Sequence, residues 1–114
     1  MNETTDIVNQ YIVASYPKDH PDDDEQKLHF VPLIKCADGF SMSVQGHWGA
    51  YCEPRVSFSR TGYSSLEIGF PSAREELIMP YIADSDSDPT KNVYAWVPVD
   101  VIVAVVEKHG GFKK

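Results

Sequence analysis

Two cysteines and two histidines in the first half of the chain have side chains that can bind zinc: His29, Cys36, His47 and Cys52. A structural zinc site needs four such donors in a tetrahedron. Ten residues separate Cys36 from His47 and four separate His47 from Cys52, a spacing unlike that of compact zinc knuckles. We therefore expect no metal ion or other cofactor, and two free, reduced thiols rather than a disulfide.

A cysteine nucleophile needs a base beside it, and Cys52 with His47 or His29 would be such a pair. No local motif supports it, and the chain has no glycine-rich phosphate loop, G-x-S-x-G elbow or H-E-x-x-H helix. The sequence therefore predicts a protein that is not an enzyme. The alternative is a small hydrolase or metal enzyme that uses Cys36, His47 and Cys52.

Three aspartates, Asp84, Asp86 and Asp88, have the spacing of ligands 1, 3 and 5 in a calcium-binding loop. The match then ends, because position 6, which needs glycine, is Pro89 and position 12, which needs glutamate, is Ala95. We expect a solvated acidic loop rather than a calcium site.

Aromatic and cationic residues gather in a glycine-flanked segment between Gly46 and Arg55. This segment contains His47, Trp48, Tyr51 and Arg55. Trp, Tyr and Arg are enriched at the energetic centres of protein interfaces, so the segment is a candidate partner-binding loop. The alternative is that Trp48 folds back and covers the edge of the core.

The formal net charge of -7 is concentrated in two short stretches. Five acids, including Asp22, Asp23 and Asp24, lie between Asp19 and Glu25, and three more are Asp84, Asp86 and Asp88. The rest of the chain has nine acids and ten bases, so it is almost neutral. The two stretches are candidates for steering a basic partner, although they would equally keep loops solvated. Direct binding of nucleic acid is disfavoured, since no basic patch is present to neutralise phosphates.

Size and composition indicate a single globular domain over residues 1–114. Hydrophobic residues make up 42% and charged residues 24%, both close to the averages for folded proteins. No apolar run approaches the roughly 18 residues of a membrane span, and the polar N-terminus has no signal-peptide pattern. We expect a cytoplasmic protein that does not bind membranes.

Local patterns predict a helix at each end of the chain with strands between them. Helices are expected over Glu3–Tyr16 and from Pro98 to His109, with a short one starting at the capping-box pattern 72–75 and ending at Pro80. Strand candidates are Leu28–Lys35, Phe40–Val44, Ala50–Glu53, Tyr63–Phe70 and Asn92–Val97. Pro32 favours an edge position for the first strand.

Alternation and helical spacing also identify the expected core. The side chains predicted to face it are Phe40, Met42, Val44, Leu66, Ile68 and Phe70 in the strands, and Val99, Ile102, Val103 and Val106 in the last helix. This order predicts an α+β fold, a small antiparallel sheet of four to five strands with an N-terminal and a C-terminal helix packed on one face.

Four segments resemble small proteins encoded in bacteriophages and prophages: 36–45 (CADGFSMSVQ), 51–55 (YCEPR), 67–72 (EIGFPS) with 79–81 (MPY), and 97–100 (VPVD) through 109–111 (HGG). Acidic phage proteins of this size without catalytic motifs are similar in type to inhibitors of host defence, including anti-CRISPR proteins. The resemblance thus implies an inhibitor of a host nucleic-acid-targeting defence complex, acting in the bacterial cytoplasm on a protein or ribonucleoprotein with a basic surface. The alternative is a phage virion or assembly component, and the oligomeric state stays open.

Overall fold

The structure, a computed structural model, describes residues 6–19, 28–59 and 61–113. Its elements in chain order are α1 (Ile7–Ala14), β1 (Ile34–Lys35), β2 (Ser41–Gln45), β3 (Ser65–Gly69), the 3-10 helices η1 (Glu76–Tyr81) and η2 (Pro89–Lys91), β4 (Val93–Pro98) and α2 (Val99–Lys108). The four strands form one sheet in the order β1-β2-β3-β4, and every neighbouring pair is antiparallel.

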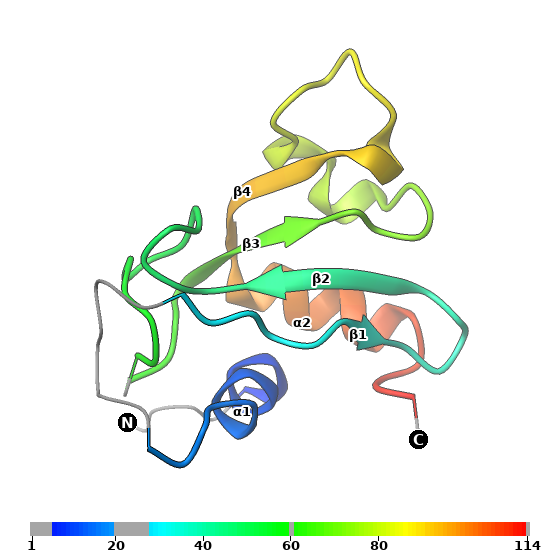
Figure 1. Cartoon of the computed structure of the whole chain (residues 1–114). Helices are drawn as coiled ribbons and strands as arrows, with labels where there is room; N and C mark the ends of the chain where they lie inside the picture. Colours follow the sequence, from blue (N-terminus) through cyan, green and yellow to red (C-terminus); the bar gives the residue numbers. More distant parts are fainter. Residues whose placement is uncertain (1–5, 20–27, 60, 114) are drawn as a thin grey trace.

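Both α-helices lie on one side of the sheet and contact each other (Figure 1). We call the opposite side of the sheet the open face. The predicted α+β fold is confirmed with four strands. The proposed strand Ala50–Glu53 is wrong, because that segment turns and makes only a single bridge between Glu53 and Ser65.

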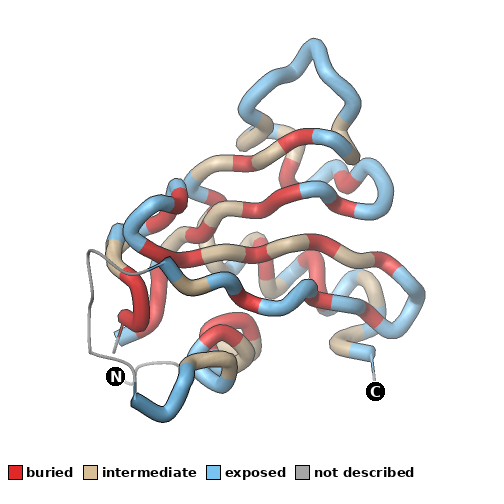
Figure 2. The backbone as a smooth tube through the Cα atoms, viewed as in Figure 1, coloured by how far each residue is buried: buried red, intermediate tan, exposed pale blue. Residues whose placement is uncertain are grey.

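Alternating burial along the strands builds the core between sheet and helices (Figure 2). Met42 and Val44 of β2 and Leu66 and Ile68 of β3 are buried, as the alternation predicted. In α2 the buried residues are Ile102, Val105 and Val106. Ile102 and Val106 were predicted correctly, whereas Val99 and Val103 are only partly buried, at the margin of the core.

Helix α1 is shorter than predicted, although residues 3–5 lie outside the described residues. The carboxylate of Asp6 accepts a hydrogen bond from the Asn9 backbone at 2.6 Å and caps the helix start. The helix ends at Ala14 rather than Tyr16, and the Ser15 hydroxyl donates to the carbonyl of Ile12. In the described parts of the chain, no helix has the length and apolar character needed to cross a membrane.

The first predicted strand is mostly not a strand. Only Ile34–Lys35 pairs with β2, at the edge of the sheet as Pro32 indicated. The preceding residues are held by side chains instead: the Gln45 amide bonds both the N–H and the carbonyl of Val31, at 2.7 and 2.9 Å. The backbone groups of Val31 thus have partners without ladder bonds.

The capping box proposed at residues 72–75 is also wrong. The helix η1 begins only at Glu76, and the Ser72 hydroxyl instead accepts a hydrogen bond from the Ser41 backbone at 2.9 Å. The Glu75 carboxylate caps η1 by accepting from Leu77 N at 2.9 Å. Pro80 lies inside η1 rather than beyond its end, and the helix continues to Tyr81.

Candidate functional site

Strand register brings polar and small residues together on the open face. Ser43 pairs with Gly69 and Gly69 with Val93, while Gln45 pairs with Glu67 in the next row. These residues form the floor of a pocket of roughly 350 Å³. In the described parts of the chain the helices cover only the other side, and Ser43, Gln45, Glu67 and Val93 are partly exposed.

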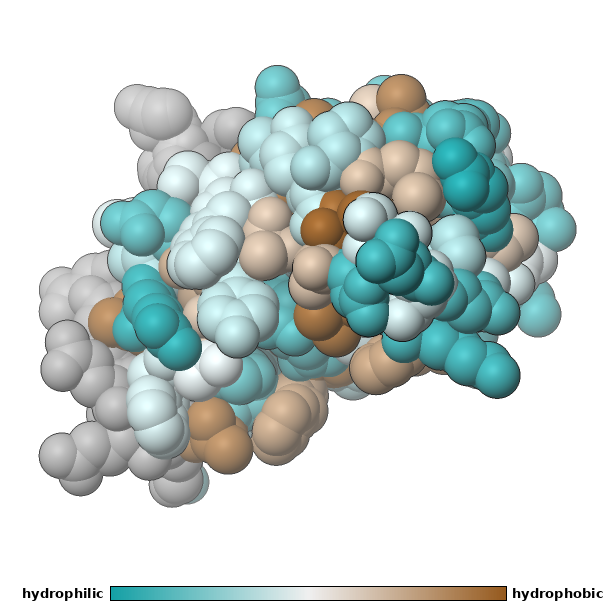
Figure 3. Space-filling model, turned by 90° about the horizontal axis from the view of Figure 1, so that it is seen from above, coloured by the Kyte–Doolittle hydropathy of each residue, from teal (hydrophilic) through white to brown (hydrophobic). Residues whose placement is uncertain are grey.

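Aromatic side chains rim the pocket and continue beyond it. Phe30, His47 and Phe70 line the pocket, and the rings of Tyr51 and Trp96 lie 5.1 Å apart nearby, with Tyr51 bonded to the pocket residue Glu67. We call these five residues the aromatic face. Figure 3 views the molecule from the end that carries the 84–92 loop and shows apolar residues in a band beside strongly hydrophilic ones.

Phe70 was predicted to face the core, and the structure contradicts this: its side chain is 60% exposed. Strand β3 ends at Gly69, and Phe70 adopts φ 52, in the left-handed region. Its N–H still bonds the carbonyl of Asn92 at 2.9 Å, so the turned conformation is held in place. A large residue rarely adopts this backbone conformation, and such strain tends to occur at functional sites.

Trp96 is turned outward by an irregularity in β4. Leu66 pairs with Val97 and Ile68 with Tyr94, so one β3 residue faces two residues of β4. Such a bulge redirects a side chain. Trp96 has φ 48, is 50% exposed, and donates its N–H to the carbonyl of Tyr51 at 3.1 Å.

The predicted aromatic loop is only partly presented to solvent. Trp48, Tyr51 and Arg55 are exposed, and they are brought together: Arg55 Nε donates to the Trp48 carbonyl at 2.9 Å, and its guanidinium lies 5.9 Å from the Tyr51 ring centre. His47 is only 7% exposed, and its Nδ1 accepts from Gly49 N at 3.1 Å. Burial lowers the pKa of His47. This histidine is therefore part of the pocket wall rather than a projecting contact.

Of the two acidic stretches, the one from Asp84 to Asp88 lies within the described residues. Asp22, Asp23 and Asp24 lie outside the described residues. Asp84 and Asp88 shape their own loop, since Asp84 accepts from the Ser87 hydroxyl at 2.6 Å and Asp88 from the Thr90 hydroxyl at 2.7 Å.

These local bonds lower the pKa of both aspartates, through the Ser87 hydroxyl at Asp84 and the Thr90 side chain and backbone at Asp88. Asp86 is exposed on the same loop. This loop therefore displays fixed negative charge in an ordered turn.

The cysteines are free, buried and held as thiols. Cys52 Sγ donates to the carbonyls of His47 and Pro54 at 3.4 and 3.3 Å. Burial raises the pKa of Cys52 to about 11, and burial followed by the nearby Asp38 raises that of Cys36. Across residues 6–19, 28–59 and 61–113, no three His, Cys, Asp or Glu side chains are grouped to hold a metal ion.

We expect both thiols to react far more slowly in the folded protein than in denaturant, because the thiolate is the reactive form and both sulfurs are buried. Absorbance with a chromogenic disulfide reagent, with and without urea, measures this. Rapid labelling of Cys52 in folded protein at mildly acidic pH would contradict it and favour the cysteine-enzyme alternative.

A charged cluster around the buried Glu75, which the sequence did not reveal, joins three distant segments. Glu75 is 1% exposed, and its carboxylate accepts from Lys108 Nζ at 2.8 Å and bonds His109 Nε2 at 2.7 Å. His109 Nδ1 lies 2.6 Å from Asp38, and the Phe40 ring stacks on the imidazole at 4.1 Å between centres.

The pKa values of His109, Glu75 and Asp38 shift in the direction that favours their charged forms. Burial opposes charge on His109, but the bonds to Glu75 and Asp38 outweigh it and raise its pKa. Burial likewise opposes charge on Glu75, but bonds from Lys108, the Leu77 backbone and His109 lower its pKa. Both imidazole nitrogens are bonded to carboxylates, so neither is free to take a proton from a substrate. The cluster is structural.

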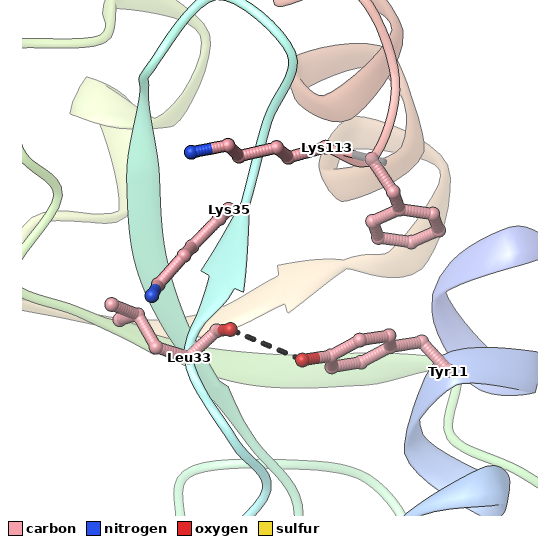
Figure 4. Close-up of a pocket in the computed structure, with 5 residues that line it drawn as sticks. Tyr11, Leu33, Lys35 and Lys113 are labelled. Carbon is pink, nitrogen blue, oxygen red and sulfur yellow. Dashed lines mark hydrogen bonds between the residues drawn. The ribbon is translucent and has the colours of Figure 1, made fainter.

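A second, more open pocket of roughly 430 Å³ lies at the outer edge of β1. Figure 4 shows the side chains of Lys35 and Lys113 extending over it, with the Tyr11 hydroxyl bonded to the Leu33 carbonyl at 3.1 Å. Phe112 stacks on Tyr11 at 5.2 Å. The ammonium groups of Lys35 and Lys113 give this pocket positive charge, which suits an anion.

The aromatic face was only partly visible in the sequence. Tyr51 and His47 were predicted, whereas Phe30, Phe70 and Trp96 were missed. Phe70 and Trp96 lie in segments that alternate like buried strands, and only the left-handed conformations turn them outward.

No family model, curated protein or solved structure is significantly similar to this chain.

Proposed function

We propose that the protein acts without catalysis, by docking its aromatic face onto another protein. The observation that carries this proposal is the exposure of Phe70 and Trp96, two large side chains in strained backbone conformations beside the same pocket. Strained backbone conformations persist where the surrounding structure holds them, and they cluster at functional sites. Exposed aromatic residues around a pocket are typical anchors of protein interfaces.

Charge supports a basic partner. The chain carries a net charge of -7, and the 84–88 loop displays aspartates in an ordered turn. Complementary charge speeds association and disfavours wrong partners. Complexes that handle nucleic acid have basic surfaces, so the proposed partner is a host defence complex of this kind, which the protein would inhibit by occupying its surface.

Alanine variants of the aromatic face test the docking proposal. We expect Trp96→Ala and Phe70→Ala each to weaken binding to a partner captured from bacterial lysate by roughly 2 kcal/mol, mainly through faster dissociation. Surface plasmon resonance with the purified partner measures this. Leu77→Ala is the control, since Leu77 is similarly exposed but lies in η1, away from the pocket lining.

The captured protein also separates the two classes of function. Recovery of a nuclease or surveillance complex whose binding depends on Trp96 supports inhibition of host defence. Recovery of capsid or tail proteins with the same dependence supports the virion alternative. Equal binding by wild type, Trp96→Ala and Phe70→Ala would contradict docking through the aromatic face.

A further inference from the structure

Among the described residues that line the pocket on the open face, the charged side chain is the carboxylate of Glu67. Its Oε1 accepts a hydrogen bond from Tyr51 N at 3.0 Å, which holds the side chain in position. Its Oε2 bonds no group in the part of the chain that the structure describes. The pocket thus presents an oriented carboxylate oxygen with spare acceptor capacity.

The Gln45 side chain on the pocket floor is already hydrogen-bonded within the chain, so it does not compete with a ligand for Glu67. The Gln45 amide already bonds both backbone groups of Val31, and its Nε2 also donates to the Ser43 hydroxyl at 2.8 Å. That leaves the Ser43 and Glu67 oxygens as the acceptors on the floor. A ligand that donates several hydrogen bonds and carries positive charge suits this set.

The walls are apolar aromatic surface. Phe30 lies against the His47 ring at 5.2 Å between centres, and Phe70 is a further wall. Burial lowers the pKa of His47, so the neutral imidazole does not repel a cation. Aromatic ring faces attract cations, and the attraction grows where water is partly excluded.

We propose that this pocket receives an arginine side chain of the partner protein, with the guanidinium against the aromatic walls and its N–H groups donating to Glu67. Arginine suits it better than lysine, because the guanidinium is flat, is more weakly hydrated and has several donors in one plane. This assignment rests on the proposed docking function and names the chemistry that the partner brings to it. The net charge of -7 favours the approach of such a residue.

The test titrates isotope-labelled protein with the capped peptide Gly-Arg-Gly and follows the backbone amide signals by NMR. We expect saturable shifts at Gly49, Gly69 and Phe70, which line the pocket, with a dissociation constant in the millimolar range. The matched control is Gly-citrulline-Gly, which has nearly the same shape without the charge and should bind much more weakly. Gly-Lys-Gly should bind more weakly than the arginine peptide.

Two variants make the test specific for the carboxylate. Glu67→Gln keeps an acceptor for Tyr51 N but removes the charge, and should weaken binding of Gly-Arg-Gly about tenfold. Glu53→Gln removes the same charge at an exposed position outside the pocket lining and should leave binding unchanged. Equal binding of the citrulline peptide, tighter binding of the lysine peptide, unchanged binding by Glu67→Gln, or no saturable shift would each overturn the assignment.

Failure of this inference is distinguishable from failure of the docking function. If Trp96→Ala weakens partner binding but the arginine peptide does not bind, docking stands and the arginine assignment is wrong. If the peptide binds in a manner that depends on Glu67 but aromatic-face variants hold the partner normally, the pocket binds arginine and the docking function is wrong.

Discussion

Replacing Glu75 with alanine should lower the free energy of unfolding by about 3 kcal/mol, the typical result of removing one partner of a buried ion pair. The carboxylate is 1% exposed and receives bonds from Lys108, His109 and the backbone of Leu77. Without it, His109 Nε2, Lys108 Nζ and the N-terminus of η1 each lose a partner, while His109 Nδ1 keeps Asp38. Urea unfolding followed by circular dichroism measures the change.

The neighbouring glutamate provides the control for this variant. Glu76 pairs with Arg74 at the surface, where both side chains are more than half exposed. Glu76→Ala should change stability by no more than about 0.5 kcal/mol. Equal losses in the two variants would show that the buried cluster does not stabilise the fold.

The same cluster predicts how stability depends on pH. The pKa of His109 is raised above 6.5, so its contribution is complete below that pH and is lost as pH rises through the folded value. The pKa of Glu75 is lowered below 4.5, so its contribution is complete above that pH and is lost as pH falls through the folded value.

Asp38 behaves like Glu75: a backbone bond from Phe40 and then the His109 side chain lower its pKa below 3.8. The cluster should therefore stabilise most between pH 4.5 and 6.5. In His109→Gln the loss on the alkaline side should disappear. Thermal unfolding over a pH series measures this, and an unchanged profile in that variant would contradict it.

Replacing Asn9 with alanine should cost about 3 kcal/mol of stability, because it removes two buried hydrogen bonds to the backbone of Tyr63. The buried Asn9 amide accepts from Tyr63 N at 2.8 Å and donates to the Tyr63 carbonyl at 2.9 Å. These bonds tie α1 to the segment that enters β3. Buried polar groups that lose their partners retain the cost of desolvation.

Two variants separate this tether from a general effect on α1. Asn9→Asp keeps the acceptor for Tyr63 N but loses the donor to the Tyr63 carbonyl and to Asp6, and it places a charge at a buried site, so its loss should be at least as large as that of Asn9→Ala. Val13→Ala, at an exposed position of the same helix, should change stability by no more than about 0.5 kcal/mol. A small loss in Asn9→Ala, as measured by urea unfolding, would show that α1 is held by apolar packing alone.

Local patterns in the sequence predicted those features of the fold that depend on residues close together in the chain. The alternation in β2 and β3 placed Met42, Val44, Leu66 and Ile68 correctly in the core, and the order of elements predicted the sheet and its helices. The bulge at Trp96 and the turn at Phe70 were not predictable, because each places an aromatic residue in the left-handed backbone region. Aromatic residues rarely adopt that region, so the residue type gives no sign of it.

The charged cluster was missed for a different reason. His109 lies 34 positions from Glu75 and 71 from Asp38, so nothing in the local sequence relates them. The sequence identified His109 only as a helix end, which is correct, since it caps α2. Long-range pairs of this kind are set by the packing of whole elements, which a single sequence does not display.

Both long edges of the sheet are already occupied within the chain. Beside β1, Lys113 N donates to the Lys35 carbonyl at 2.8 Å and Ala37 N to the Gly111 carbonyl at 2.9 Å. Beside β4, Ala83 N donates to the Val93 carbonyl at 2.9 Å, and Trp96 N is bound by Tyr51. Unpaired strand edges are the usual templates for strand donation between proteins and for fibril growth. Edges covered in this way are poor templates for both, so the docking proposed above would use side chains rather than shared backbone ladders.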